Sequence, residues 1–288
     1  MLELLLQPFN YNYMVKAMWV SMIVGGICAF LSAYLILKGW SLIGDALSHS
    51  VVPGVAGAYV LGLPYIMGAF FTGILAILAM MLIRHITRLR EDAIIGFIFS
   101  IFFAAGLLII SLNPISVNVQ SIILGNILGI ADIDILQIEI IALISFIVLY
   151  LKWKDLLVVF FDENYAFSLG LSPLRLKLLF FILLSACIVT ALQTVGVILV
   201  IAMVITPGAT AYLLTDRFSH LLIISIIMGA FTSVFGTYLS FYLNGATGGI
   251  IVILQTLLFL LAFFFAPKHG LLLKRYCTKR SFITQGDS

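Results

Sequence analysis

Long apolar stretches separated by short polar breaks dominate the chain from residue 14 onwards. A transmembrane helix needs about 20 mostly apolar residues, because the hydrocarbon core of a bilayer is about 30 Å thick. We therefore predict an all-α polytopic membrane protein with about nine transmembrane helices, and short breaks at Gly39, Gly62 and Gly196 leave eight or ten possible. The predicted spans are Met14 to Leu37, Ser41 to Leu61, Pro64 to Ile83, Ala93 to Leu112, Ile135 to Leu151, Lys177 to Gln193, Val195 to Thr215, Ser219 to Leu243 and Gly249 to Ala266.

The composition supports a membrane environment. Of the 288 residues, 63% are hydrophobic and only 9% are charged, whereas a soluble domain carries about 25% charged residues. This balance excludes a secreted disulfide scaffold, a disordered chain, a nucleic-acid-binding domain and a cytosolic enzyme. Membrane lipid is therefore an expected partner, and nucleic acid is not.

The placement of the basic residues predicts the orientation, because cytoplasmic connections carry an excess of Lys and Arg. With nine spans, all but Lys16 fall on one side of the membrane: Lys38, Arg84, Arg88, Arg90, Lys152, Lys154, Arg175, Lys177, Arg217, Lys268, Lys274, Arg275, Lys279 and Arg280. We expect the N-terminus outside and the C-terminus in the cytoplasm. Residues 1–267 are expected to form a single membrane-embedded domain, and residues 268–288 a basic cytoplasmic tail.

The longest connection predicted outside runs from Asn113 to Asp134. It contains no basic residue, and its apolar part around Ile122 to Ile130 is too short to cross a bilayer. Two interpretations remain open for this segment. It forms either a short helix lying on or dipping into the membrane, or a plain structured loop.

Asp45 and His49 are the only acid and imidazole deep within the predicted spans. Ionisable side chains are costly inside a membrane, so each is a functional candidate. A spacing of four residues places both on one helical face. They form either a polar knot in helix packing, with Asp45 accepting a hydrogen bond from His49, or a pair of ligands for a divalent ion such as Mn²⁺, Fe²⁺ or Zn²⁺.

Two ligands from one chain would hold such an ion weakly. Two copies of the chain around a two-fold axis would offer two carboxylates and two imidazoles. Small residues just beyond the pair, Gly54, Gly57 and Ala58, would permit close approach of the helices.

The longest connection predicted inside, Lys152 to Lys177, contains a short amphipathic helix in our interpretation. Asp162, Ala166 and Gly170 recur at intervals of four, with Asp162 able to cap the helix and Gly170 able to end it. The helix is either a surface element without a partner or a knob that docks into a soluble motor.

Pro207 lies within the seventh predicted span. A proline there frees the carbonyl of Met203 and bends the helix. Thr206, Gly208 and Thr210 can satisfy the backbone or line a polar path. Pro207 and Gly208 thus mark a kink that serves packing alone or acts as a hinge.

Motifs of common enzymes are missing from the sequence: HExxH, GxSxG and the GxxxxGK[ST] phosphate loop. We expect no ATPase activity and no permanently bound cofactor in this chain.

Three blocks of the sequence resemble permease subunits of the bacterial ABC importers for manganese, iron and zinc. They are SLIGDALSHSVVPGVAGAY, DENYAFSLGL and VGVILVIAMVITPGATAYLL, in that order. The resemblance runs from about Gly25 to Pro267. It implies a compact permease of the type II ABC importer kind, located in the bacterial cytoplasmic (inner) membrane.

This resemblance also implies partners and site residues. The permease would be a homodimer served by two copies of a separate cytoplasmic ABC ATPase and fed by an extracytoplasmic metal-binding protein. The metal contacts would fall on Asp45 and His49, and ATPase coupling on Asp162, Glu163, Ala166 and Gly170. The outer gating segment would fall within 113–134. The rival interpretation is an ion channel or proton-coupled secondary carrier that uses Asp45 and His49, although one Asp and one His are thin support for either.

Overall fold

The computed structural model describes residues 6–87, 89–112 and 129–266, and every regular element within these ranges is a helix. This confirms the predicted all-α class. Seven of the helices are long and apolar enough to cross a membrane. They are α2 (Asn12–Lys38), α5 (Tyr65–Ile86), α6 (Glu91–Leu112), α8 (Asp132–Phe161), α10 (Pro173–Val195), α12 (Phe218–Leu243) and α13 (Thr247–Phe265).

The other two predicted spans take a different form. The second is split at Val51 into α3 (Ser41–Ser50) and α4 (Val52–Leu61), so the expectation of one continuous helix is wrong. Pro53 explains the break, because it has no N–H to donate to the carbonyl of His49. The seventh is α11 (Val197–Leu214), which is apolar but shorter than the seven long helices. Two small helices, η1 (Gln7–Asn10) and α9 (Glu163–Ser168), complete the described chain.

Helix α8 is longer than the predicted span at both ends. It begins at Asp132 and ends at Phe161, whereas hydropathy placed it from Ile135 to Leu151. Asp132 and Asp134 lie in its first turn, where carboxylates interact favourably with the helix dipole. At the other end, Lys152 pairs with Asp155 at 3.0 Å on the helix surface, so α8 continues past its apolar part.

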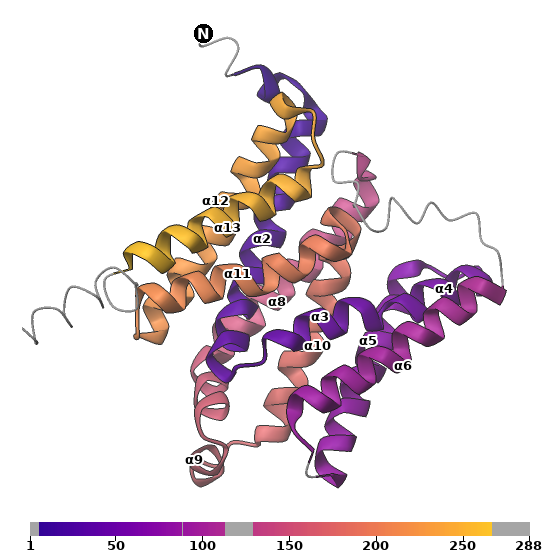
Figure 1. The fold of residues 1–288 in the computed structure, drawn as a ribbon, viewed down its shortest axis with the longest axis vertical. Helices are drawn as coiled ribbons and strands as arrows, with labels where there is room; N and C mark the ends of the chain where they lie inside the picture. Colours follow the sequence, from indigo (N-terminus) through magenta and orange to yellow (C-terminus); the bar gives the residue numbers. More distant parts are fainter. Residues whose placement is uncertain (1–5, 88, 113–128, 267–288) are drawn as a thin grey trace, which may run out of the picture.

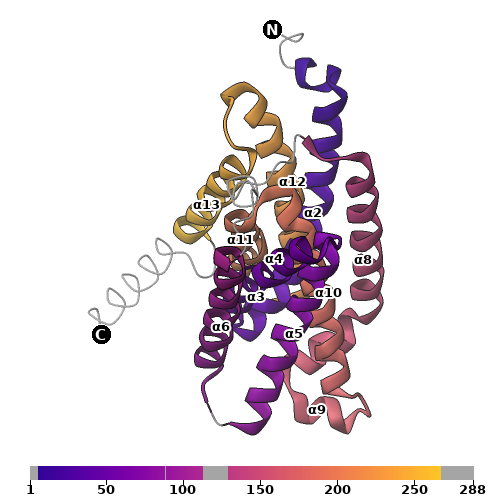
Figure 2. The ribbon, with the colours of Figure 1, turned by 90° about the vertical axis from the view of Figure 1, so that its right-hand side faces the viewer.

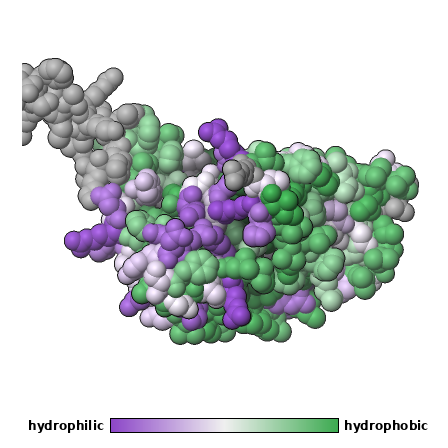
Figure 3. Space-filling model, turned by 90° about the horizontal axis from the view of Figure 1, so that it is seen from below, coloured by the Kyte–Doolittle hydropathy of each residue, from purple (hydrophilic) through white to green (hydrophobic). Residues whose placement is uncertain are grey.

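Helix α2 lies near the centre of the bundle, where it packs against α8, α10, α11 and α12 (Figures 1 and 2). Helices α3 to α6 pack on one another, and α10 joins them to α2 and α8. Helix α9 lies at one end of the molecule, and the N-terminal part of α2 lies at the other (Figure 2). Seen from the α9 end, hydrophilic side chains gather in part of the surface and hydrophobic ones flank them (Figure 3).

Hydroxyl groups hold α2 and α12 together inside the apolar bundle. Ser225 donates to the carbonyl of Ala29 at 2.7 Å, and Thr237 donates to the hydroxyl of Ser21 at 3.0 Å. Interhelical hydrogen bonds and close packing drive helix association in lipid, where the hydrophobic effect between helices is absent. These contacts fix the central helix pair that supports the rest of the bundle.

The predicted orientation can be tested at two exposed positions, Ala246 and Ser168. The turn after α12 lies near η1, since Tyr11 contacts Phe241 at 5.6 Å between ring centroids, and Ser168 ends α9 at the opposite end. In a cysteine-free background, a cysteine at Ala246 should react with an impermeant thiol reagent added outside intact cells, whereas one at Ser168 should react only after permeabilisation. Labelling of Ser168 in intact cells would reverse the orientation.

Candidate functional site

Helix α3 brings Asp45 and His49 together on one face, as their spacing predicts. The Nε2 atom of His49 lies 3.4 Å from the Oδ1 atom of Asp45. The side chain of Asp45 is 41% exposed and that of His49 is 26% exposed. Both side chains are therefore partly accessible, on a face that the described part of the chain covers only in part.

The other residues of α3 explain why these two side chains are partly exposed, because they occupy the side of the helix that packs into the bundle. Ile43, Leu47 and Ser48 are buried in the bundle. On the side of α6, the imidazole of His49 makes edge contacts with Phe99 and Phe103, at 5.2 and 5.4 Å between ring centroids. These rings fix the orientation of the imidazole while leaving its Nε2 atom directed towards Asp45.

A complete metal site is not formed within one copy of the chain. Among the described residues, no group of three or more His, Cys, Asp or Glu side chains is placed to hold a metal ion. Asp45 and His49 together supply two donor atoms of the kinds that Mn²⁺, Fe²⁺ and Zn²⁺ accept. Any further ligands must come from water, from another chain or from outside the described residues.

Two of the three small residues beyond this pair pack within one copy of the chain. Gly54 and Ala58 are buried against α5, and a Cβ atom at Gly54 would lie 2.1 Å from the carbonyl oxygen of Gly68. They therefore serve packing within one chain. Gly57 is partly exposed, and a Cβ atom there would meet nothing within 4 Å. Of the three residues, Gly57 alone faces open space at its Cβ position.

Helix α9 forms where the sequence predicts it, between α8 and α10. The Asp162 carboxylate caps it by accepting from the backbone N–H groups of Asn164 and Tyr165, at 2.9 and 3.2 Å. Gly170 follows it with φ of 76°, a left-handed conformation that glycine adopts without strain. Ala166 is fully buried. Both ends of α9 are thus fixed, and the helix packs against the rest of the protein through Ala166.

Three large apolar side chains in and directly after α9 are exposed. Tyr165, Phe167 and Leu169 are 57%, 64% and 54% exposed. Large exposed apolar side chains at an aqueous end of a protein mark interaction surfaces when they form a patch. We call these three residues the α9 knob.

Glu163, the first residue of α9, is directed towards the bundle. Its carboxylate pairs with Lys177 and lies 3.9 Å from Lys38 and 4.0 Å from Arg84. Partial burial acts to raise the pKa of this carboxyl group, but the hydrogen bond from Lys177 and the three positive charges outweigh it, so the pKa is lowered. The stabilisation from these contacts is therefore present at neutral pH and is lost as the pH falls through the lowered pKa.

A serine of α2 bonds to the backbone of α11 on either side of Pro207, which lies inside α11. Ser32 donates to the carbonyl of Ile205 at 3.1 Å and accepts from the N–H of Gly208 at 3.0 Å. A Cβ atom at position 208 would lie 2.5 Å from the Ser32 hydroxyl oxygen. Gly208 is therefore required for this close approach. Thr210 donates to the carbonyl of Thr206 one turn earlier, at 2.7 Å.

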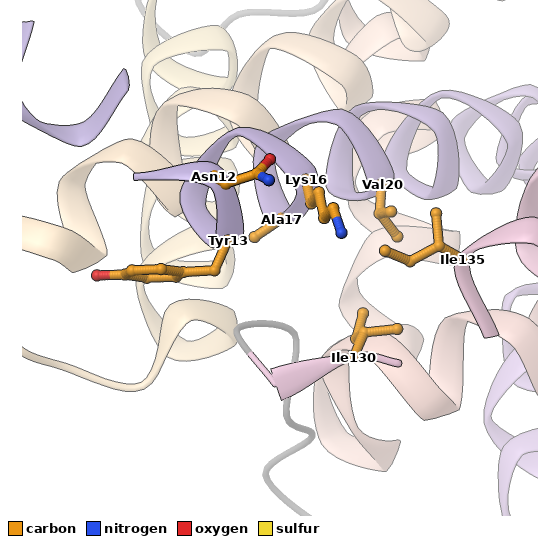
Figure 4. A pocket seen from close by; sticks show the side chains of 7 residues that line it. All are labelled: Asn12, Tyr13, Lys16, Ala17, Val20, Ile130 and Ile135. Carbon is orange, nitrogen blue, oxygen red and sulfur yellow. The ribbon is translucent and has the colours of Figure 1, made fainter. Parts of the chain in front are cut away.

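At the end of the molecule opposite α9, polar contacts join α2 and α8. Lys16 pairs with Asp132, and Trp19 donates to Glu139 at 3.0 Å. A cavity of about 270 Å³ lies beside them, lined by Asn12, Tyr13, Lys16, Ala17, Val20, Ile130 and Ile135 (Figure 4). The predicted outer loop begins at Asn113 and falls mainly in residues 113–128, outside the described residues. Its last part, Asp132 and Asp134, belongs to α8.

Some of the residues around the site could not be identified in the sequence. Ser32 and Trp40 carry no motif, and each acts through partners that are distant along the chain. The one local signal was the sequence of Lys38, Gly39 and Trp40 at a predicted helix boundary, since tryptophan is common at membrane interfaces.

Known proteins similar to this chain are membrane components of transport systems. The chain is 80% identical over 279 residues to "Chelated iron transport system membrane protein YfeC" of Yersinia pestis, covering 97% of this chain and 95% of that protein. It is 47% identical over 280 residues to "Manganese transport system membrane protein MntB" of Synechocystis sp., covering 96% and 90%.

A solved structure and a family description agree with these relatives. The structure of "PsaBC from Streptococcus pneumoniae in complex with Fab" matches with a TM-score of 0.85 and 33% identity, covering 96% of this chain and 100% of that one. Residues 10–266 match the family described as "ABC 3 transport family". This multi-pass membrane protein therefore belongs to the ABC 3 transport family.

Proposed function

We propose that this chain is the permease subunit of an ABC importer that moves a divalent transition-metal ion into the bacterial cytoplasm. Relatives named for iron and manganese transport favour Fe²⁺ or Mn²⁺, and the donor types also suit Zn²⁺. The observation that carries the proposal is the Asp45 and His49 pair on the partly exposed face of α3. The transported ion is the substrate, held only in passing.

In this proposal two copies of the chain face each other across a two-fold axis near α3. Each copy contributes Asp45 and His49, so the ion meets two carboxylates and two imidazoles. The partly exposed state of both side chains, and the open space at Gly57, suit such a contact. Protons compete with the ion, because both ligands bind metal in their deprotonated forms.

The energy for transport comes from a separate subunit in this scheme. Two copies of a cytoplasmic ABC ATPase dock at α9, and an extracytoplasmic binding protein delivers the ion at the opposite end of the bundle. A channel or proton-coupled carrier is the less favoured function, because the chain belongs to a family of ABC transport proteins. A channel would conduct ions without ATP.

The proposal is tested with the permease, its ATPase and its binding protein in proteoliposomes. Radiolabelled Mn²⁺, Fe²⁺ or Zn²⁺ should accumulate only when ATP is hydrolysed, and unlabelled metals should compete in order of their affinity. Metal flux that is unaffected by omission of ATP or the ATPase would support a channel instead.

The α9 knob is expected to carry much of the affinity for the ATPase. Replacing Phe167 by Ser should weaken co-purification of the ATPase by roughly 30-fold, because a central aromatic anchor contributes about 2 kcal/mol or more to binding. Leu61→Ser is the control, since Leu61 is 72% exposed but lies at the end of α4. Equal co-purification of both variants and the parent would place the ATPase contact elsewhere.

A further inference from the structure

A tryptophan and five charged side chains meet at the α9 end of the bundle. We name this group the Trp40 cluster, and its members are Lys38, Trp40, Arg84, Glu91, Glu163 and Lys177. Trp40 is only 3% exposed, although it lies between two helices at an end of the bundle. The cluster thus holds a buried indole beneath a layer of ion pairs.

The contacts run without interruption from α9 to α6. Glu163 pairs with Lys177 and approaches Lys38 and Arg84. The Nη2 atom of Arg84 lies 2.7 Å from the Oε1 atom of Glu91. The second carboxylate oxygen of Glu91 accepts from the indole Nε1 of Trp40.

The indole ring is also held by its faces and edges. The charged groups of Lys38 and Arg84 lie 5.9 and 5.6 Å from its centre, within the range of a cation–π interaction. On the apolar side, Phe160 of α8 and Phe181 of α10 each lie 5.4 Å away between ring centroids. Trp40 is therefore fixed relative to five helices.

The position of Trp40 in the chain connects this cluster to the proposed metal path. Trp40 is the residue immediately before α3, and Asp45 follows it by five residues on that same helix. Glu163 is the first residue of α9. A displacement of α9 would act on Lys38, Arg84 and Lys177 directly and on the start of α3 through Glu91 and Trp40.

We propose that the Trp40 cluster transmits movement of α9 to α3, with Glu163 and Trp40 as positioning residues. This inference rests on the proposed function and adds the connection between its two sites. Glu163 then serves the interior of the permease, while the α9 knob serves the ATPase. The competing explanation is that the cluster only anchors α9 to the bundle.

Two variants that alter the cluster without emptying it separate these two explanations. The side chains of Arg84, Glu91 and Glu163 are 41%, 38% and 35% exposed, and ion pairs between such side chains contribute little to stability. The side chain of Lys177 is only 9% exposed, so its partner at position 163 must keep an atom that accepts a hydrogen bond. Glu163→Gln removes the charge and keeps a carbonyl oxygen that can accept from Lys177. Trp40→Phe keeps an aromatic ring against Phe160 and Phe181 and removes the donor to Glu91. Both variants are therefore expected to assemble.

The test measures metal ions transported per ATP hydrolysed in the reconstituted complex. For both variants this ratio should fall about tenfold, a size typical of coupling between two sites, while co-purification of the ATPase and its rate of ATP hydrolysis stay near the parental values. Asp155→Asn is the matched control, because it breaks the exposed ion pair with Lys152 on α8, which lies outside the cluster. Its ratio should not change.

Each outcome has a separate meaning. If the parental complex shows no ATP-driven metal uptake, the proposed function is wrong. If the parent transports and both variants keep its ratio, the cluster transmits nothing and the inference is overturned. If loss of transport follows loss of ATPase binding in both variants, the cluster is an anchor and the inference is also overturned. Should Glu163→Gln fail to assemble, Trp40→Phe decides between these outcomes.

Discussion

Asp45→Asn and His49→Ala should each lower ATP-driven metal uptake to the level of vesicles without the permease. In the proposed dimer every substitution is present twice, so either variant removes two of the four ligands. Substitutions that only affect residues supporting a metal ligand cost about 10–100-fold in affinity or activity, and loss of ligands should exceed roughly 100-fold. Asn retains the size of Asp and some hydrogen bonding, so the loss should reflect its charge.

Radiolabelled Mn²⁺ or Fe²⁺ uptake in proteoliposomes checks this expectation, together with protein level and co-purification of the ATPase. The matched controls are Asp155→Asn and His85→Ala, which change the same residue types at a partly exposed position of α8 and an exposed position of α5. Both controls should transport at the parental rate. Parental transport by Asp45→Asn and His49→Ala would show that the pair is a polar knot in helix packing.

The helical spans were predictable because lipid imposes a simple rule on composition, but the helix ends were not. Hydropathy ended the fifth span at Leu151, whereas α8 continues to Phe161. A helix leaving the membrane needs only hydrogen bonding and some packing, and Leu156, Val159 and Phe160 are buried against neighbouring helices. Hydropathy predicts which residues lie within the bilayer. It does not predict how far a helix continues outside the bilayer by packing against other helices.

The second span shows a different limit. Pro53 was visible in the sequence, yet the stretch from Ser41 to Leu61 is apolar and of the right length for one helix. The break at Val51 shortens α3 to ten residues and leaves Asp45 and His49 on a half-helix. Length and apolarity alone could not distinguish a broken span from a continuous one.

Local features of the candidate site were predictable, and its long-range contacts were not. Asp162 caps α9 and Gly170 ends it through interactions within a few residues, which sequence spacing encodes. Ser32 reaches Gly208 across 176 positions, and Trp40 reaches Glu91 across 51. No periodicity of the sequence predicts pairs at such separations. Only the packing of α2 on α11, and of α3 on α6, brings them together.

Gly208→Val should destabilise the permease more than Ser32→Ala, which truncates the serine that contacts Gly208. A Cβ atom at position 208 would lie 2.5 Å from the Ser32 hydroxyl oxygen and 2.7 Å from its backbone carbonyl carbon and oxygen. Backbone atoms cannot rotate away as a side chain can, so α2 and α11 must separate. Overpacking of this kind costs about 1–3 kcal/mol, and separation also breaks the bond from the Gly208 N–H to Ser32.

Comparison with Ser32→Ala separates the steric cost from the lost hydrogen bonds. Ser32→Ala removes the donor to Ile205 and the acceptor for Gly208 without adding atoms. Hydrogen bonds between membrane helices contribute about 0.6 kcal/mol on average, so two of them should cost about 1 kcal/mol. Thermal unfolding in detergent should rank the parent as most stable, followed by Ser32→Ala and then Gly208→Val.

Gly96→Ala is the control for adding a side chain to a helical glycine. A Cβ atom at Gly96 in α6 would meet nothing within 4 Å, and alanine is favoured over glycine in a helix by about 1 kcal/mol. This control should unfold at or above the parental temperature. If Gly208→Val unfolded at the parental temperature, α2 and α11 would not be in close contact. A valine side chain at position 208 needs the space that Ser32 fills. The two hydrogen bonds between Ser32 and the backbone of α11 would then be absent as well.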